Sequence, residues 1–396
     1  MTPPQGALAG IRIIDFSRFL PAAYCSWICG DMGADVVRIE HPRELAKEAS
    51  VFNASGETPE QAHLRRARAT QTRNKRSVLL NPGNALAREA IHQLIRGADI
   101  LIEDYRPGVL ARMGYAYADM AQLNPRLIYV SVSFAGQTGP LSNRAGHDPL
   151  ALSLSGALSR LHGTPAPSMP GLQVADTLAG AHATIAALVA LQARHLTGKG
   201  QHVDVAMSDA CLPLMMLTLA RAPGGDASRL APPDGSWHPK GGVWRCADGQ
   251  YLCTTDMEAT YWRRFCEVIG RPDYIGKQHA KDAWPAMEQE LKQIFLTKTR
   301  DAWHALLSAA DTQAMPVYSL AEALAHPHNR ARGMVAELRL GDATVTQIGT
   351  PFHLSETPAR APALAPRPGE HTEAVLTEIG WQDRIEELKA AGAFEG

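Results

Sequence analysis

Two short segments carry the side chains best suited to catalysis. Gly146-His147-Asp148 follows the glycine-rich run Gly136-Gln137-Thr138-Gly139-Pro140. A histidine in such a loop can act as a general base, because its unperturbed pKa lies near the operating pH. Further along, Asp176 begins a long helix of small residues, and backbone N–H groups at a helix start could hold an oxyanion beside that carboxylate. Both segments are therefore candidate parts of an active site.

Each candidate also has a purely structural interpretation. Asp148 could cap a helix that starts at Pro149, because proline is favoured at the first helical position. Asp176 could be the N-cap of its own helix. Glu258, which follows an expected strand at residues 251–254, could be a charge at a helix start and nothing more. Residue types alone leave both interpretations open.

Basic side chains next to expected strands are candidates for binding an anion. Arg38 lies at the carboxyl end of an expected strand, where its guanidinium could grip a phosphate or pair with a neighbouring carboxylate at the surface. The cluster Thr72-Arg73-Asn74-Lys75-Arg76 lies just before another strand. It suits a nucleotide phosphate, and a solvated basic face is the alternative.

Composition and absent motifs exclude several classes of function. The formal net charge is −1, with 45% hydrophobic and 20% charged residues, which is typical of a soluble globular protein without a nucleic-acid partner. P-loop, GxGxxG and GxSxG motifs do not occur, so we expect no nicotinamide or flavin cofactor. The six scattered cysteines indicate neither a metal site nor a disulfide scaffold. Because the sequence shows no signal-peptide pattern and no apolar run of about 20 residues, we expect a cytoplasmic protein without membrane association.

The amino-terminal half alternates short β-branched runs with apolar-periodic helices. Strands are predicted at residues 11–16, 35–39, 77–80, 99–105, 127–132 and 202–206. Helices are predicted near residues 22–33, 84–96 and 177–196. This alternation predicts an α/β fold with an open parallel sheet, and ligands of such sheets usually bind beyond the carboxyl ends of the strands.

The pattern changes after an expected helix at residues 207–221. A linker rich in Gly, Pro and Ser leads to a hairpin with strands at residues 243–245 and 251–254, and then to helices near residues 259–269, 284–297 and 299–309. A second hairpin and two short helices follow. We therefore predict a large domain that begins with residues 1–221, a linker and small α/β domain at 222–325, and a return segment at 326–396 that completes the large domain.

Several sequence phrases along the chain occur in the order of a known superfamily. They lie at residues 10–17, 33–40, 74–77, 98–109, 124–129 and 197–204. Over nearly its whole length the chain thereby resembles the family III CoA-transferases and α-methylacyl-CoA racemases, the CaiB/BaiF type. The resemblance implies a Rossmann-like large domain, a smaller α/β domain, an interlaced homodimer and an acyl-coenzyme A substrate.

The resemblance also implies which residues contact coenzyme A (CoA). By position they are Arg38, Thr72, Arg73, Asn74, Lys75, Asp104, Tyr105, Arg106, Arg112, Gly146 and Asp148. With this context, phosphate binding becomes the favoured interpretation of the basic cluster.

The superfamily performs two kinds of chemistry with the same aspartate. In a racemase, Asp176 supported by Glu258 would serve one face of the α-carbon of a 2-methylacyl-CoA thioester, and His147 would serve the other. In a transferase, Asp176 would be a nucleophile that moves CoA between two carboxylic acids through an aspartyl-CoA thioester. We favour the racemase hypothesis because these three residues together suit proton transfer. The transferase is the alternative, and a CoA-binding protein without catalysis is a third hypothesis.

The chain also departs from the racemase pattern. Pro149-Leu150-Ala151 follows the Gly-His-Asp motif where an Ile-Asn-Tyr-like run is usual, and Pro21-Ala22-Ala23 replaces the common Ala-Gly-Pro. These departures keep the transferase alternative open.

Overall fold

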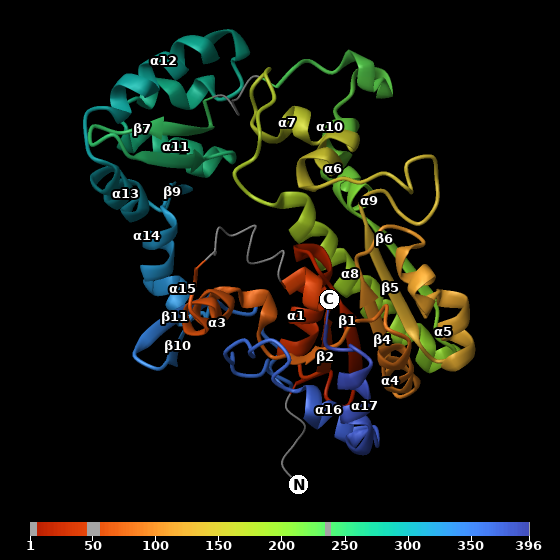
Figure 1. Cartoon of the computed structure of the whole chain (residues 1–396). Helices are drawn as coiled ribbons and strands as arrows, with labels where there is room; N and C mark the ends of the chain where they lie inside the picture. Colours follow the sequence, from red (N-terminus) through yellow and green to blue (C-terminus); the bar gives the residue numbers. More distant parts are fainter. Residues whose placement is uncertain (1–5, 46–55, 234–238, 396) are drawn as a thin grey trace. The chain divides into compact units, whose positions relative to one another are not determined.

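A computed structural model describes residues 6–45, 56–233 and 239–395 (Figure 1). The chain forms two compact units, each described here by itself. The first comprises Met1–Ser159, Ser168–Arg229 and Ala331–Gly396, and the second comprises Arg160–Pro167 and Leu230–Arg330. These limits lie at other residues than the predicted domain boundaries, which followed composition. Residues 234–238 of the predicted linker lie outside the described residues.

The first unit is organised around a parallel sheet, whose strand order in the described part of the chain is β3-β2-β1-β4-β5-β6. Its strands are β1 (Arg12–Phe16), β2 (Asp35–Glu40), β3 (Arg76–Leu79), β4 (Ile100–Glu103), β5 (Ile128–Ser133) and β6 (His202–Ala206). All neighbouring pairs run parallel, which confirms the predicted fold class. After β3 the chain returns to the other side of β1 with β4. The carboxyl ends of β1 and β4 therefore form a topological switch point, where such sheets bind ligands.

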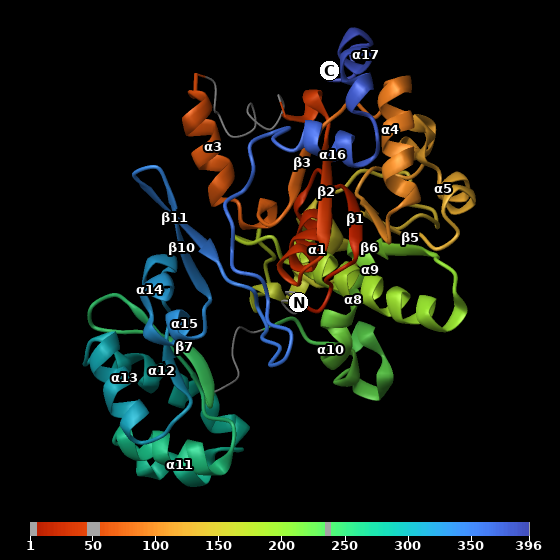
Figure 2. The same ribbon diagram turned by 90° about the horizontal axis from the view of Figure 1, so that it is seen from below.

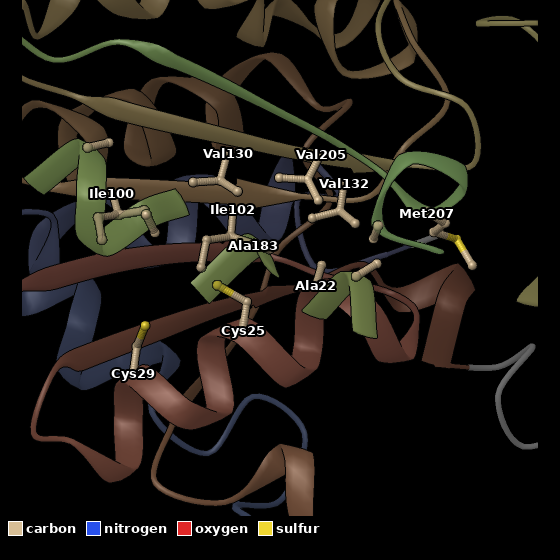
Figure 3. Packing of buried hydrophobic residues seen from close by; sticks show 14 of the residues in the cluster. Ala22, Cys25, Cys29, Ile100, Ile102, Val130, Val132, Ala183, Val205 and Met207 are labelled. Atoms are coloured by element: carbon tan, nitrogen blue, oxygen red, sulfur yellow. The ribbon is translucent and has the colours of Figure 1, made fainter. Parts of the chain in front are cut away.

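Helices cover both faces of this sheet (Figures 1 and 2). One face carries α1 (Leu20–Asp31), α6 (Asp148–Leu154), α8 (Val174–Thr197) and α9 (Met207–Cys211). The other carries α4 (Ala85–Arg96), α5 (Tyr117–Leu123), α16 (Thr372–Glu378) and α17 (Ile385–Ala390). Successive strand residues point to opposite faces, so Ile13 and Ile14 belong to different hydrophobic clusters. Figure 3 shows Ala22 and Cys25 of α1 facing the strands within the first cluster.

The long helix α8 packs closely against α1 through small side chains. Its buried positions include Ala175, Ala179, Gly180, Ala183, Ala187 and Ala190. A Cβ on Gly180 would lie 2.6 Å from Cβ of Tyr24 and 2.7 Å from the carbonyl oxygen of Pro21, so only glycine permits this approach. Within the described ranges, α8 is the one helix long and apolar enough to cross a membrane. Its alanine face is buried in the first hydrophobic cluster, as in the core helix of a globular unit.

The predicted helix at residues 207–221 is broken in the structure. α9 ends at Cys211, a 3-10 turn spans Leu212–Met215, and α10 covers Met216–Ala220. Pro213 interrupts the helix because it has no backbone N–H to donate. Further short helices of the chain are α3 (Pro59–Arg68), α7 (Leu158–Leu161) and α15 (Pro327–Ala331).

The second unit contains a small antiparallel sheet, whose described strands have the order β7-β8-β9. Its elements are β7 (Gly241–Arg245), β8 (Tyr251–Thr255), β9 (Ala314–Pro316), α11 (Ala259–Val268), α12 (Trp284–Phe295), α13 (Arg300–Ala309) and α14 (Leu320–Ala325). Gly249 has a φ of +79° in the turn between β7 and β8, which suits glycine. Trp244 stacks on Phe295 in the core at a centroid distance of 5.4 Å. The predicted hairpin and helices are thus confirmed with slightly different ends.

The carboxyl-terminal segment completes the first unit. It forms the hairpin of β10 (Val335–Leu340) and β11 (Ala343–Ile348) and then follows the edge of the parallel sheet. There the backbone N–H of Leu79 on β3 donates to Oγ1 of Thr372 at 3.0 Å, and that of His371 donates to the carbonyl oxygen of Ser77 at 2.9 Å. The return segment therefore satisfies the edge of β3. The interlaced dimer stays a prediction for this chain.

Candidate active site

A cavity of about 590 Å³ opens at the switch point between β1 and β4. Its walls are the segments after β1, β4 and β5, the loop before α6 and the first turn of α8, with the lining residues Arg18, Phe19, Leu20, Pro21, Asp104, Tyr105, Arg106, Pro107, Val109, Val132, Ser133, Phe134, Arg144, Ala145, Gly146, His147, Asp176 and Met207. All of them belong to the first unit. The structure thus brings Asp176, His147 and the segment 104–106 to one cavity, as the sequence predicts.

Asp176 lies in the first turn of α8, whose N-cap is Gln173. The alternative that Asp176 is itself the N-cap is therefore wrong. Burial, together with the negative charges of Asp148 and Asp104, raises the pKa of the Asp176 carboxyl to about 6, and the charge of His147 acts in the opposite direction. At neutral pH this carboxyl is mostly ionised, yet it takes up a proton more readily than an ordinary aspartate.

Asp148 connects the starts of two helices. It is 5% exposed and occupies the first position of α6, whose N-cap is His147. Its Oδ2 accepts a hydrogen bond from the backbone N–H of Asp176 at 3.0 Å, so it caps α8 and not the helix at Pro149. The predicted CoA contact of Asp148 stays a prediction, and the structure shows its carboxylate buried between helices. Because the backbone N–H of Asp176 already donates to Asp148, it is not available to donate a hydrogen bond to an oxyanion.

His147 is exposed and lines the cavity beside Phe19, whose ring it meets edge-on at a centroid distance of 5.9 Å. Gly146 before it lies so close to Phe134 that a Cβ would be 2.3 Å from a ring carbon. A larger residue at position 146 would therefore displace the ring or the loop. The glycine-rich run 136–139 is not among the lining residues. It turns toward β6, where Gln137 donates its backbone N–H to Asp204 at 2.9 Å.

Arg18, which follows β1, is a cavity residue that sequence reasoning missed. Its Nε lies 3.3 Å from Oδ1 of Asp104, and its Cζ lies 3.8 Å from the ring centroid of Tyr105. Asp104 also accepts the backbone N–H of Phe19 at 2.8 Å. These contacts join the segments that follow β1 and β4. The signal available in the sequence is the place of Arg18 just beyond a strand end, where the sheet binds ligands.

Arg73 and Lys75 form buried ion pairs. Nη2 of Arg73 lies 2.6 Å from Oδ2 of Asp31 at the end of α1, and both side chains are 0% exposed. Nζ of Lys75 lies 3.0 Å from Oδ2 of Asp15 on β1. That both cations hold CoA phosphates stays a prediction, and the structure gives each of them a buried carboxylate partner instead of a free charge. The two pairs attach the loop before β3 to α1 and β1.

The remaining predicted CoA contacts lie in varied surroundings. Arg38 is partly buried at the end of β2, where it forms an ion pair with Glu40. Thr72 is buried, and the side chain of Asn74 points to α1, where it donates to Asp31 at 2.8 Å. Arg112 is exposed in the turn Ala111–Tyr115. In the described part of the chain, no cluster of three or more His, Cys, Asp or Glu side chains could hold a metal ion.

The comparison with known proteins decides the family. A sequence model described as CoA-transferase family III matches residues 8–372. The chain belongs to CoA-transferase family III. The beta subunit of succinyl-CoA–L-malate CoA-transferase from Chloroflexus aurantiacus is 31% identical over 94% of both chains. Formyl-CoA:oxalate CoA-transferase from Rhodopseudomonas palustris is 29% identical over 98% of this chain and 97% of its own. A CaiB/BaiF family protein from Brucella suis shares the fold, with a TM-score of 0.78 and 24% identity over 95% of this chain and 100% of that chain.

The membership confirms the predicted superfamily and shows that the protein is an enzyme. The relatives named above are CoA-transferases, so they support the transferase alternative better than the racemase hypothesis that the sequence analysis favours. Glu258, the third residue of that hypothesis, lies in the second unit. There it is exposed, forms the N-cap of α11 and accepts a hydrogen bond from Nε2 of Gln313 at 3.1 Å.

We expect Asp148→Asn to move the acid limb of the pH–activity profile to lower pH. The amide oxygen can still accept the N–H of Asp176, whereas the negative charge that helps to raise the Asp176 pKa is lost. Measuring kcat/KM against pH for both proteins tests this expectation. Asp148→Ala is the control, since it also removes the acceptor and should cost about 1–3 kcal/mol of stability. An unchanged acid limb in the Asn variant would contradict the coupling.

Proposed function

We propose that this enzyme transfers CoA between carboxylic acids, with Asp176 as the nucleophile. The observation that carries the proposal is that the first turn of α8 presents this carboxylate to the switch-point cavity of a family III chain. Relatives are named for succinyl, malate, glutarate and oxalate substrates. Their names support small carboxylic acids as donors and acceptors.

The proposed reaction proceeds through covalent intermediates on Asp176. A carboxylate oxygen attacks the thioester carbonyl carbon, the C–S bond breaks, and CoA leaves as a thiolate from an acyl-aspartyl anhydride. The thiolate then attacks the aspartyl carbonyl carbon, so the donor carboxylate leaves and an aspartyl-CoA thioester remains. The acceptor carboxylate then attacks the aspartyl carbonyl carbon and displaces the CoA thiolate, which gives a second anhydride. The thiolate attacks the acceptor's carbonyl carbon, so the new acyl-CoA forms and the Asp176 carboxylate leaves. One anion enters and one leaves at each step, so no net proton transfer or redox partner is needed.

The surroundings of Asp176 support this role. Its pKa of about 6 leaves it ionised at neutral pH, and partial burial removes some of the water that would weaken it as a nucleophile. His147 lines the same cavity. A positive or hydrogen-bonding group there would stabilise the negative charge that moves between thiolate, carboxylate and carbonyl oxygen.

Trapping with hydroxylamine tests the covalent route. Incubation with an acyl-CoA and hydroxylamine should convert the aspartyl-CoA thioester into an aspartyl hydroxamate, which peptide mass spectrometry would locate at Asp176. The Asp176→Asn variant should show no such adduct. If short mono- and dicarboxylic acyl-CoA substrates all fail to give an adduct on the unaltered enzyme, the covalent route is wrong. Exchange of the α-hydrogen of a 2-methylacyl-CoA in D₂O would instead support racemase chemistry.

A further inference from the structure

Arg144 is a cation on the cavity wall that the covalent chemistry of Asp176 does not use. Arg144 is an exposed residue of the cavity lining, and its backbone is held in a turn by a hydrogen bond from its N–H to the carbonyl oxygen of Leu141 at 2.8 Å. Within the described residues its guanidinium has no ion-pair or hydrogen-bond partner. An uncompensated guanidinium on the wall of a substrate cavity is a candidate binding group for an anion.

The two other arginines of the cavity wall, Arg18 and Arg106, are less suited to bind the acyl group. Arg18 pairs with Asp104 and lies over Tyr105, so its charge is offset. Arg106 lies three residues after the end of β4, in the segment for which the sequence predicts CoA contacts. In the described part of the chain this leaves Arg144 as the arginine of the cavity wall that has neither a carboxylate partner nor a predicted CoA contact.

The loop that carries Arg144 leads directly to the nucleophile. Gly146 is packed on the Phe134 ring, and Asp148 accepts the backbone N–H of Asp176 at 3.0 Å. Arg144 and Asp148 are four positions apart in the chain, so the distance between their Cα atoms is at most about 14 Å. Of the basic residues on the wall, His147 is the one that contributes to the pKa of the Asp176 carboxyl, which it lowers. Arg144 therefore shares one cavity with the reacting carboxyl without being paired with it, which suits contact with the far end of a short acyl chain.

We propose that Arg144 forms a subsite for the distal carboxylate of a dicarboxylic acyl group. The inference rests on the proposed function, and it adds the substrate class. A guanidinium fork matches a carboxylate through two parallel hydrogen bonds. The same subsite serves donor and acceptor, because each acid in turn places one carboxyl at Asp176 and its other carboxyl along the cavity. Monocarboxylic acids of equal length leave the subsite unfilled and react more slowly.

Paired substrates test this subsite. We would measure kcat/KM with succinyl-CoA and butyryl-CoA, which have acyl chains of the same length, for the unaltered enzyme and for Arg144→Met. The variant should lose about 10- to 100-fold with succinyl-CoA, the usual effect of removing one charge-assisted contact, and less than about threefold with butyryl-CoA. Arg144→Lys keeps the charge but not the planar guanidinium, so its kcat/KM with succinyl-CoA should lie between the values of the unaltered enzyme and of Arg144→Met.

Arg106→Met is the matched control from the same cavity, and it should affect both thioesters alike if it contacts their shared CoA portion. An equal loss with both thioesters in Arg144→Met, or no loss with either, would overturn the inference. Hydroxylamine trapping on the unaltered enzyme keeps the two proposals separate. An Asp176 adduct without acyl-chain discrimination by Arg144 refutes the subsite alone, whereas the absence of any adduct refutes the covalent route.

Discussion

Asp176→Asn should abolish CoA transfer while leaving CoA binding nearly intact. The amide keeps the size of the side chain and the position of α8, but it offers no carboxylate oxygen to attack a thioester. We expect kcat/KM to fall by about 10⁴-fold or more, as for the loss of other enzyme nucleophiles. Transfer of CoA from an acyl-CoA to a labelled acid measures activity, and isothermal titration with CoA measures binding.

The stability of this variant provides its control. The folded pKa of Asp176 is about 6 and the ordinary value is 3.8, so the ionised carboxyl opposes folding at neutral pH. Asn at this position should therefore leave the thermal unfolding temperature unchanged or raise it. In the unaltered enzyme, kcat/KM should decline as the pH falls through about 6, because the protonated carboxyl is not a nucleophile. Substantial turnover by the Asn variant would refute the central role of Asp176.

Arg73→Met should destabilise the first unit rather than weaken CoA binding selectively. The Arg73 guanidinium makes two contacts with Asp31, at 2.6 and 3.1 Å, and donates to the carbonyl oxygen of Ile348 at 2.6 Å. Removing one member of a fully buried pair leaves the other charge without compensation in the interior. Such changes typically cost about 3–5 kcal/mol. Urea unfolding followed by circular dichroism measures the loss.

Arg76→Met is the matched control, because it removes a cation from the same segment. Arg76 pairs with Asp35 at 2.7 Å and also with Glu378, and these side chains are 23%, 34% and 40% exposed, so its removal should cost less than the loss of the fully buried Arg73 pair. If Arg73→Met unfolds at the same urea concentration as the unaltered protein but no longer binds CoA, Arg73 contacts the substrate as the sequence predicts. A loss of stability for Arg73 alone supports its structural role.

The strands of the first unit are predictable from the sequence because local composition determines them. β5 is buried along its whole length in the parallel sheet and β6 at its carboxyl end, each carries two or more β-branched residues, and helices with apolar periodicity such as α4 separate such segments. The break of the helix after α9 has a local cause as well, since Pro213 is visible in the sequence. The prediction of one continuous helix at residues 207–221 is wrong because it gave the helical pattern precedence over this proline.

The basic cluster shows where local information ends. Arg73 and Lys75 have the composition of a phosphate site, a solvated face or a buried ion pair, and nothing within the segment distinguishes these. Their partners, Asp31 and Asp15, lie 42 and 60 residues away in sequence. Burial and pairing at such separations follow from the packing of α1 on the sheet. Arg144 is missed for a related reason, because only the folded loop places it on the cavity wall.

The sequence by itself determines the fold class, the family and the candidate aspartate, since these depend on periodicity and on motifs that remain local. The tertiary structure decides the electrostatics of the site. It places Asp148 under the backbone N–H of Asp176, brings His147 to the same cavity and withdraws Arg73 and Lys75 into the interior. Burial and the distances between charges set pKa values and binding groups. Both arise only when segments far apart in the chain meet at the switch point of the sheet.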